Sequence, residues 1–258
     1  MSDIIPIFYD HSSEKSILTF WNPKDCYANG PQSIFSMAEE AKLKEIVFVS
    51  KSFATFLEAW KGCKSRNIKL IFGVEIIMCD DAKAQTPESR YNEHKIIVFA
   101  RNSKGYSDLL KVYSSYHTDP THKYYRQRFD YNQLAALWTP DLYMSVPFFD
   151  GFIARNLLGF NTNILPDLSF CNKNISLFQE VGTEHPHELL ISDAISKYVA
   201  ASNNKVQKTK TIYYKNRKDF RAYTVYRAIQ NGGSFADPDI EYFCSDAFCF
   251  EVWRNLST

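Results

Sequence analysis

Several features that would assign a protein to a common class are missing from this sequence. Its 258 residues include 30 Lys and Arg against 29 Asp and Glu, so neither charge is in excess and the formal net charge is +1. A near-neutral chain argues against a nucleic-acid binder that relies on a large basic surface. The six cysteines form no CxxC pair and no zinc-like spacing, which indicates reduced core thiols in a cytoplasmic protein.

Long apolar runs are also absent. No uninterrupted apolar stretch approaches the length of a membrane span, and the amino terminus MSDIIPIFYDHSSEKS lacks the basic start and apolar run of a signal peptide. The sequence contains no GxSxG elbow and no phosphate-binding P-loop. We therefore expect a cytoplasmic protein without a membrane partner.

The chain is rich in aromatic residues and in alternating structural patterns. Hydrophobic residues make up 45% of it, with 20 Phe and 16 Tyr, which is typical of a globular domain with a sizeable core. Apolar, β-rich runs alternate about seven times with segments of helical period; they lie near residues 4–8, 45–50, 69–77, 95–100, 142–146, 175–181 and 209–214. This alternation predicts a mainly parallel sheet, open or closed as a barrel, with functional groups at the carboxyl ends of its strands.

Two segments carry a specific resemblance. They are SIFSMAEEAKLKEIVFVSKSFATFLEAWKGCKSRNIKLIFGVEI, residues 33–76, and HKIIVFARNSKGYSDLLKVYS, residues 94–114. Both resemble the amino-terminal region of the α subunit of bacterial DNA polymerase III, a domain of the PHP (polymerase and histidinol phosphatase) superfamily. The resemblance implies a distorted seven-stranded (β/α)7 barrel. It implies a single domain over residues 1–258, with the barrel in 1–235 and a carboxyl-terminal extension helix in 236–258.

The resemblance also implies where a catalytic site would lie. Active members of the superfamily hydrolyse phosphoesters with two or three divalent metals, and such a cluster needs many anionic or imidazole ligands. Their ligand motifs align with nine positions here: Asp10, Ser12, Ser50, Lys51, Glu75, His94, Pro147, Thr211 and Tyr213. His11 lies between the first two positions, and strand alternation points its side chain away from the barrel mouth.

Few of these positions hold a metal ligand. Glu75, in an intact GVE motif, and His94 are the weak candidates that remain, and Asp10 is a doubtful third. Pro147 cannot bind a metal through its side chain, and neither Thr211 nor Tyr213 suits a magnesium, manganese or zinc cluster.

We therefore predict no catalytic residue, no metal and no cofactor, the alternative being one weakly bound divalent metal. Lys51 places an ammonium where an imidazole would bind metal. We expect it to pair with Glu75, because a buried unpaired carboxylate would be costly.

Two other segments mix histidine with charge. HPHE, residues 185–188, stands at a predicted helix start, where Pro186 and Glu188 favour capping over metal binding. HTDPTHKYYRQRF, residues 117–129, combines basic and aromatic side chains in a predicted loop. A solvated loop is the simpler interpretation, and the same mix can also grip phosphates and stack bases.

Three functional hypotheses follow. The leading one is a non-catalytic PHP-like module, a scaffold or docking domain in DNA replication. Its partners would be replication proteins, such as a proofreading exonuclease subunit or the polymerase core, and its charge gives no indication of direct DNA contact. The second is a weak metal-dependent phosphoesterase or exonuclease that uses Glu75, His94, Asp10 and His11 around one metal. The third is a mimic of the polymerase domain that captures a replication subunit.

Overall fold

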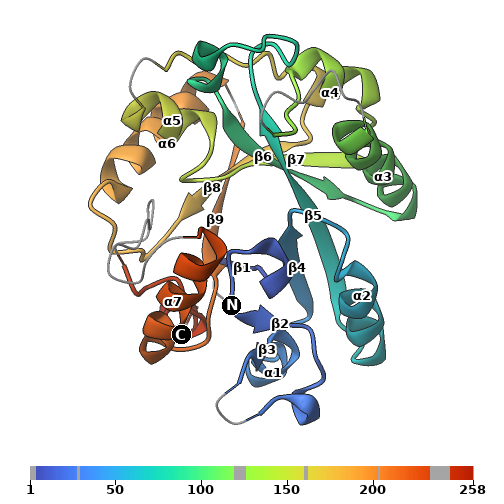
Figure 1. Cartoon of the computed structure of the whole chain (residues 1–258), viewed down its shortest axis with the longest axis vertical. Helices are drawn as coiled ribbons and strands as arrows, with labels where there is room; N and C mark the ends of the chain where they lie inside the picture. The colour runs from blue at the N-terminus through green and yellow to red at the C-terminus, as the bar shows by residue number, and fades with distance from the viewer. Residues whose placement is uncertain are drawn as a thin grey trace. The chain divides into compact units, whose positions relative to one another are not determined.

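The computed structural model describes residues 4–27, 30–118, 126–159, 162–202, 204–232 and 245–257. Within these ranges, seven strands form a closed barrel in the order β1-β4-β5-β6-β7-β8-β9 (Figure 1). Their bounds are β1 Ile5–Phe8, β4 Glu45–Ser50, β5 Lys69–Met78, β6 His94–Ala100, β7 Leu142–Val146, β8 Ile175–Glu180 and β9 Lys205–Ile212. The predicted seven-stranded α/β barrel is therefore confirmed.

Eight helices accompany the strands in the described part of the chain. They are α1 Ile34–Glu40, α2 Phe56–Ser65, α3 Ser103–Thr118, α4 Tyr131–Leu137, α5 Phe152–Leu158, α6 Glu188–Ser202, α7 Phe220–Gln230 and α8 Phe250–Ser257. A separate two-stranded sheet is formed by β2 (Leu18–Thr19) and β3 (Gln32–Ser33). None of the described helices is both long and apolar enough to cross a bilayer.

One strand departs from the expected parallel arrangement. β6 runs antiparallel to β5 and also to β7, whereas β1 pairs in parallel with β4 and β9, and β7 pairs in parallel with β8. β5 and β6 are joined by residues 79–93, which hold only a short 3-10 turn, η3 (Pro87–Arg90). A parallel partner would need a crossover, usually through an α-helix, and this connection contains no α-helix and returns the chain in the opposite direction.

The chain divides into two compact units, which are described separately. Unit 1 comprises residues 1–72, 180–188 and 208–258. In it, β1 aligns Ile7 with Val47 of β4 and with Thr211 of β9. Its core is largely aromatic, with Phe48 packed edge-on against Phe20 at 4.6 Å between ring centroids. α8 is held to the start of the chain, because the Trp253 indole donates a hydrogen bond to the Ile4 carbonyl (3.0 Å).

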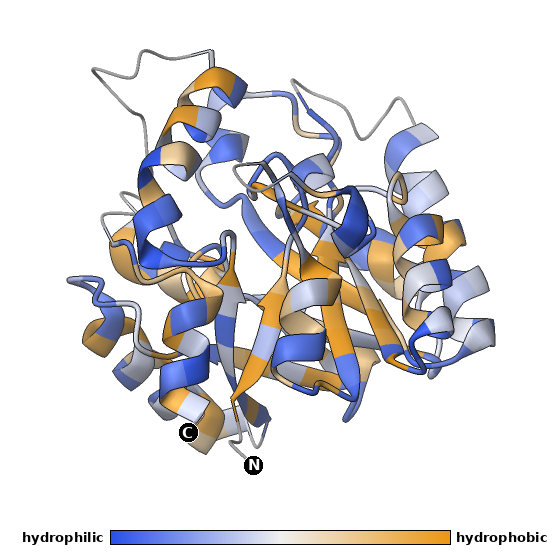
Figure 2. Cartoon of the chain, turned by 90° about the horizontal axis from the view of Figure 1, so that it is seen from below, coloured by the Kyte–Doolittle hydropathy of each residue, from blue (hydrophilic) through white to orange (hydrophobic). Residues whose placement is uncertain are grey.

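Unit 2 comprises residues 73–179 and 189–207 and contains most of β5, all of β6 and β7, and α3 to α5. One face of its sheet presents Ile76, Ile96 and Val98, all fully buried. Figure 2 shows apolar residues concentrated along the strands, while the helices carry both apolar and polar faces. The opposite face of these strands carries Glu75 and Lys95.

Two sequence predictions fall partly outside the described ranges. Residues 119–125 of the basic, aromatic loop are among them, as are residues 236–244 of the predicted carboxyl-terminal extension. The rest of that extension contains α8.

Candidate functional site

The first candidate positions lie just after β1 in unit 1. Asp10 is fully buried, and its Oδ1 accepts a hydrogen bond from the Ser12 hydroxyl (2.8 Å). Its Oδ2 is buried without a hydrogen-bond partner among the described residues, and His11 Nδ1 lies 3.7 Å from it. Ser12 Oγ also lies 3.4 Å from Ser50 Oγ and 3.3 Å from Thr55 Oγ1. The arrangement is one carboxylate among hydroxyl groups, which is a poor set of ligands for a metal cluster.

Lys51 follows the carboxyl end of β4, beside Ser50. Its ammonium lies 2.7 Å from Glu14 Oε2, and both side chains are roughly half exposed. The contact that the structure gives Lys51 is therefore with Glu14, whereas the sequence predicted Glu75. A surface pair of this kind contributes little to stability, typically less than about 1 kcal/mol.

Thr211 and Tyr213 lie at the end of β9. The Thr211 hydroxyl donates to Glu180 Oε2 (2.7 Å) and its backbone N–H to Glu180 Oε1 (2.6 Å). The Tyr213 ring is buried and stacks on Tyr223 at 5.6 Å between centroids. Both positions of the last family motif thus serve the packing of unit 1.

Glu180 was not singled out from the sequence. It is buried at the end of β8, and its Oε1 lies 3.7 Å from Nζ of Lys210, which is also buried. Lys210 donates to the Gly182 carbonyl (3.0 Å). Burial raises the pKa of Glu180 and lowers the pKa of Lys210, because removal from water disfavours both charges. The sequence did carry a signal, an acid that closes the apolar run ISLFQE.

In unit 2, the register of β5 and β6 separates the two candidate metal ligands. The ladder pairs Ile77 with Lys95 and Met78 with His94. Side chains alternate between the faces of a strand, so Glu75 shares one face with Lys95, and His94 lies on the other. The structure therefore does not bring Glu75 and His94 to one metal ion.

His94 is instead part of the packing beneath the helices. Its Nε2 lies 2.7 Å from the Tyr131 hydroxyl, its Nδ1 lies 2.9 Å from the Asn92 carbonyl, and its ring meets Phe152 edge-on. Burial lowers the pKa of His94 to about 4. A neutral imidazole with both nitrogens engaged by protein groups is typical of a structural core histidine.

Lys95 provides the positive charge near Glu75. Its Nζ lies 2.6 Å from Asp150 Oδ2, and its backbone N–H donates to the Asp150 carbonyl (2.7 Å). Burial opposes the charge of Lys95, but Asp150 and Glu75 outweigh burial and hold its pKa above the ordinary value. Pro147 stands in the same turn as Asp150, between β7 and α5. Neither Lys95 nor Asp150 was identified from the sequence, although a lysine inside the run KIIVFA was a visible irregularity.

The residues present do not fit a metal cluster. No group of three or more His, Cys, Asp or Glu side chains in the described ranges is arranged to hold a metal ion. Two or three closely spaced cations would need many such ligands.

The HPHE segment forms the start of α6. Thr183 donates its backbone N–H (3.1 Å) and its hydroxyl to Glu188 Oε2, and the His187 N–H donates to His185 Nδ1 (3.2 Å). These contacts fix the segment before α6, and Glu188 is an acidic residue in the first turn, where its charge favours the helix dipole.

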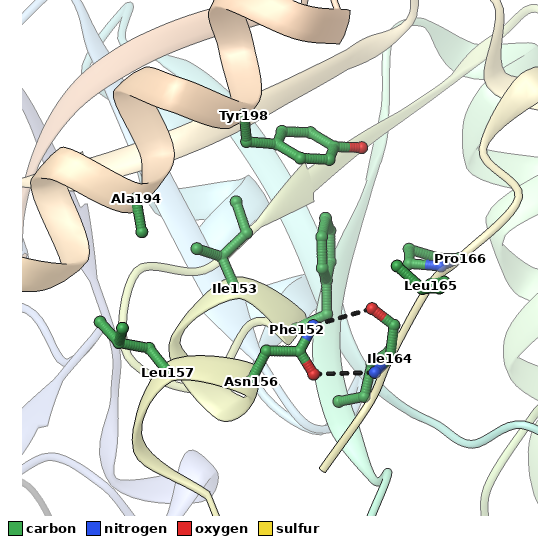
Figure 3. Close-up of a pocket in the computed structure, with 9 residues that line it drawn as sticks. All are labelled: Phe152, Ile153, Asn156, Leu157, Ile164, Leu165, Pro166, Ala194 and Tyr198. Carbon is green, nitrogen blue, oxygen red and sulfur yellow. Dashed lines mark hydrogen bonds between the residues drawn. The ribbon is translucent and has the colours of Figure 1, made fainter.

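An apolar groove of about 410 Å³ opens on unit 2 between α5 and α6 (Figure 3). Its nine lining residues are uncharged: Phe152, Ile153, Asn156, Leu157, Ile164, Leu165, Pro166, Ala194 and Tyr198. The Asn156 amide fixes one wall, because it donates to the Ile164 carbonyl and accepts from the Ile164 N–H, both at 2.8 Å. Leu157 is 42% and Leu165 is 83% exposed, so part of the apolar lining is open to solvent.

Comparison with known proteins assigns the family. A family model described as the PHP domain matches residues 28–182, which is more than half of the chain. The match spans the positions of Lys51, Glu75, His94 and Pro147, and Asp10 and Thr211 lie outside it. No curated protein matches the chain. A closed seven-stranded barrel agrees with the family match, and the chain belongs to the PHP domain family.

Proposed function

We propose that this chain is a non-catalytic PHP domain related to the polymerase III α subunit, which acts as a scaffold or docking module in DNA replication. The observation that carries the proposal is the use of the family's ligand positions for other contacts. Lys51 pairs with Glu14, His94 packs against Tyr131, and Thr211 binds Glu180. Side chains committed in this way support a barrel that holds its shape without a catalytic metal.

The apolar groove supports the docking part of the proposal. An uncharged, partly open groove suits apolar side chains of a partner segment, since well-packed apolar anchors supply most of the binding energy of such contacts. The resemblance to the polymerase domain points to replication proteins as partners, with a proofreading exonuclease subunit or the polymerase core as the first choices. The near-neutral charge of the chain gives no support for DNA as the main ligand.

Direct binding tests the docking role. The purified protein would be immobilised and titrated with a purified proofreading exonuclease subunit and, separately, with a purified polymerase core. We expect Leu157→Asp, which places a charge at the groove, to weaken binding about tenfold or more.

The matched control is Leu57→Asp on α2, an exposed leucine away from the groove residues. It should bind as the wild type does. Failure of the wild type to bind either replication protein would refute the docking role. If both substitutions weakened binding equally, the groove would not be the docking surface.

A further inference from the structure

Three segments that the resemblance aligned with metal-ligand motifs contribute charges to one cluster in unit 2. Glu75 belongs to the third motif, Lys95 follows His94 of the fourth, and Asp150 lies three residues after Pro147 of the fifth. The β5–β6 register places Glu75 and Lys95 on the same face, the one opposite to His94. Since His94 packs under α4 and α5, this shared face is the one that lines the barrel lumen.

Lys95 is fixed within the cluster by two contacts with one residue. Its ammonium lies 2.6 Å from the Asp150 carboxylate, and its backbone N–H holds the Asp150 carbonyl at 2.7 Å. Glu75 and Lys95 stand diagonally across two neighbouring strands, a separation that long side chains span. One ammonium therefore contacts the Asp150 carboxylate and lies within reach of the Glu75 carboxylate on the neighbouring strand.

Neighbouring charged residues also make contacts of their own. Glu93 is engaged by Arg126 Nε (3.1 Å) and by Arg128 Nη1 (3.0 Å). The positive charge of Arg126 opposes that of Lys95. Lys95 is thus a cation that contacts Asp150 directly and lies on the same face as Glu75.

We propose that Lys95 is a built-in cation, which balances the lumen carboxylates Glu75 and Asp150 as a bound metal ion would. The inference deepens the proposed function and rests on it. Carboxylates taken out of water are costly unless a positive charge compensates them. A divalent ion can supply that charge, but it must be captured from solution. A lysine ammonium is part of the chain, so the folded barrel carries its own compensation at any metal concentration.

The inference predicts opposite responses to a divalent metal in two proteins. The wild type should unfold at the same temperature with Mn²⁺ as with EDTA, because Lys95 already balances the carboxylates. Lys95→Ala removes the shared cation, and we expect its melting temperature to be about 5 °C lower. Mn²⁺ should then restore part of that loss in a saturable way, since ligand that binds only the folded state stabilises it.

Thermal unfolding monitored by circular dichroism, with Mn²⁺ or EDTA, provides the test. Lys95→Arg keeps a cation, so its melting temperature should not change with Mn²⁺. The double variant Lys95→Ala, Glu75→Gln should lose the stabilisation by Mn²⁺ that Lys95→Ala shows. A Lys95→Ala variant that is insensitive to Mn²⁺, or a double variant that keeps the full response, would overturn the inference.

If Lys95→Ala does not fold, the response of the wild type to Mn²⁺ still tests the inference. Saturable stabilisation of the wild type by Mn²⁺, abolished by Glu75→Gln, would show that a metal rather than Lys95 balances the carboxylates. Failure of the proposed function can be told apart from failure of this inference, because the wild type would then show metal-dependent hydrolysis. An inert wild type with a Mn²⁺-insensitive Lys95→Ala variant refutes only the role of Lys95.

Discussion

At the scale of single residues, Asp10 is a buried carboxylate that directly follows the first barrel strand and its next residue, Tyr9. One of its oxygens accepts from Ser12, and the other is buried without a described hydrogen-bond partner. Burying a charge that is only half satisfied costs free energy. Under the proposed function, Asp10 is a residue inherited from a metal site and not one selected for stability.

Substitution of Asp10 tests that interpretation. Asp10→Asn keeps an acceptor for Ser12 and removes the charge, so we expect the free energy of unfolding at pH 7 to stay equal or rise by about 1 kcal/mol. Urea denaturation measures it. Asp130→Asn is the control, because both Asp130 oxygens accept backbone N–H groups, of Gln133 and Ala82, and it should destabilise by about 1 kcal/mol. A loss from Asp10→Asn as large as that of the control would contradict the interpretation.

His94 makes the stability of the fold depend on pH. Its pKa is about 4 in the folded protein, because burial disfavours the imidazolium, against about 6.5 when unfolded. The unfolded chain therefore binds more protons between these two values, and stability falls as the pH decreases from about 6.5 towards 4.

We expect the wild type to lose about 2 kcal/mol more than His94→Gln between pH 7 and pH 5. Urea denaturation of both proteins at the two pH values measures the difference, in which the other titrating groups cancel. Equal losses would show that His94 is not the buried neutral residue that the structure describes.

The charged partners of these residues could not be read from the sequence. The sequence indicated Glu75 and His94 by type and motif, but whether two side chains share a face depends on the register between strands. Lys95 and Asp150 are 55 positions apart, and Lys210 lies 30 positions from Glu180. A single sequence shows the charged residues but not which of them pair, so both ion pairs were missed.

At the scale of elements, α3 shows why certain residues of the family-like segment stand where they do. The Asn102 side chain accepts from the Gly105 N–H (2.8 Å) and donates to Asp141 Oδ1 (2.8 Å). Asn102 thus satisfies the first turn of the helix and ties it to the residue before β7. Gly105 then allows the helix backbone to approach the Asp141 carbonyl closely.

A methyl group at Gly105 should disrupt this approach. A Cβ there would lie 2.2 Å from the Asp141 carbonyl oxygen, a backbone atom that cannot move aside alone. We expect Gly105→Ala to destabilise the protein by about 2–3 kcal/mol, despite the better helix propensity of alanine. Ser107→Ala, on the exposed face of the same helix, should change stability by no more than about 0.5 kcal/mol, and urea denaturation compares the two. A tolerated Gly105→Ala would contradict the described packing of α3.

Element type was predicted more reliably than strand direction. The apolar runs and helical periods gave the strands and helices of the barrel, because those patterns record burial directly. The antiparallel direction of β6 escaped prediction, since it depends on how the polar loop 79–93 and the two helices after β6 route the chain.

The fold and the family agree at the scale of the whole molecule. The described ranges form a closed seven-stranded barrel, and the PHP match covers its middle portion, from residue 28 to 182. The proposed loss of catalysis concerns the same scale, because a metal cluster needs ligands from many strands at once. The proposal holds that several of these ligands are replaced here, which would remove the cluster even though single acids such as Glu75 persist.

The most direct test of the account is the initial rate at which the purified protein hydrolyses a generic phosphodiester with Mn²⁺ or Zn²⁺, compared with EDTA. We predict equal rates in all three conditions, because the ligand positions are committed to Glu14, Tyr131, Glu180 and the aromatic core. A saturable, metal-dependent rate that disappears in Glu75→Ala would contradict the account.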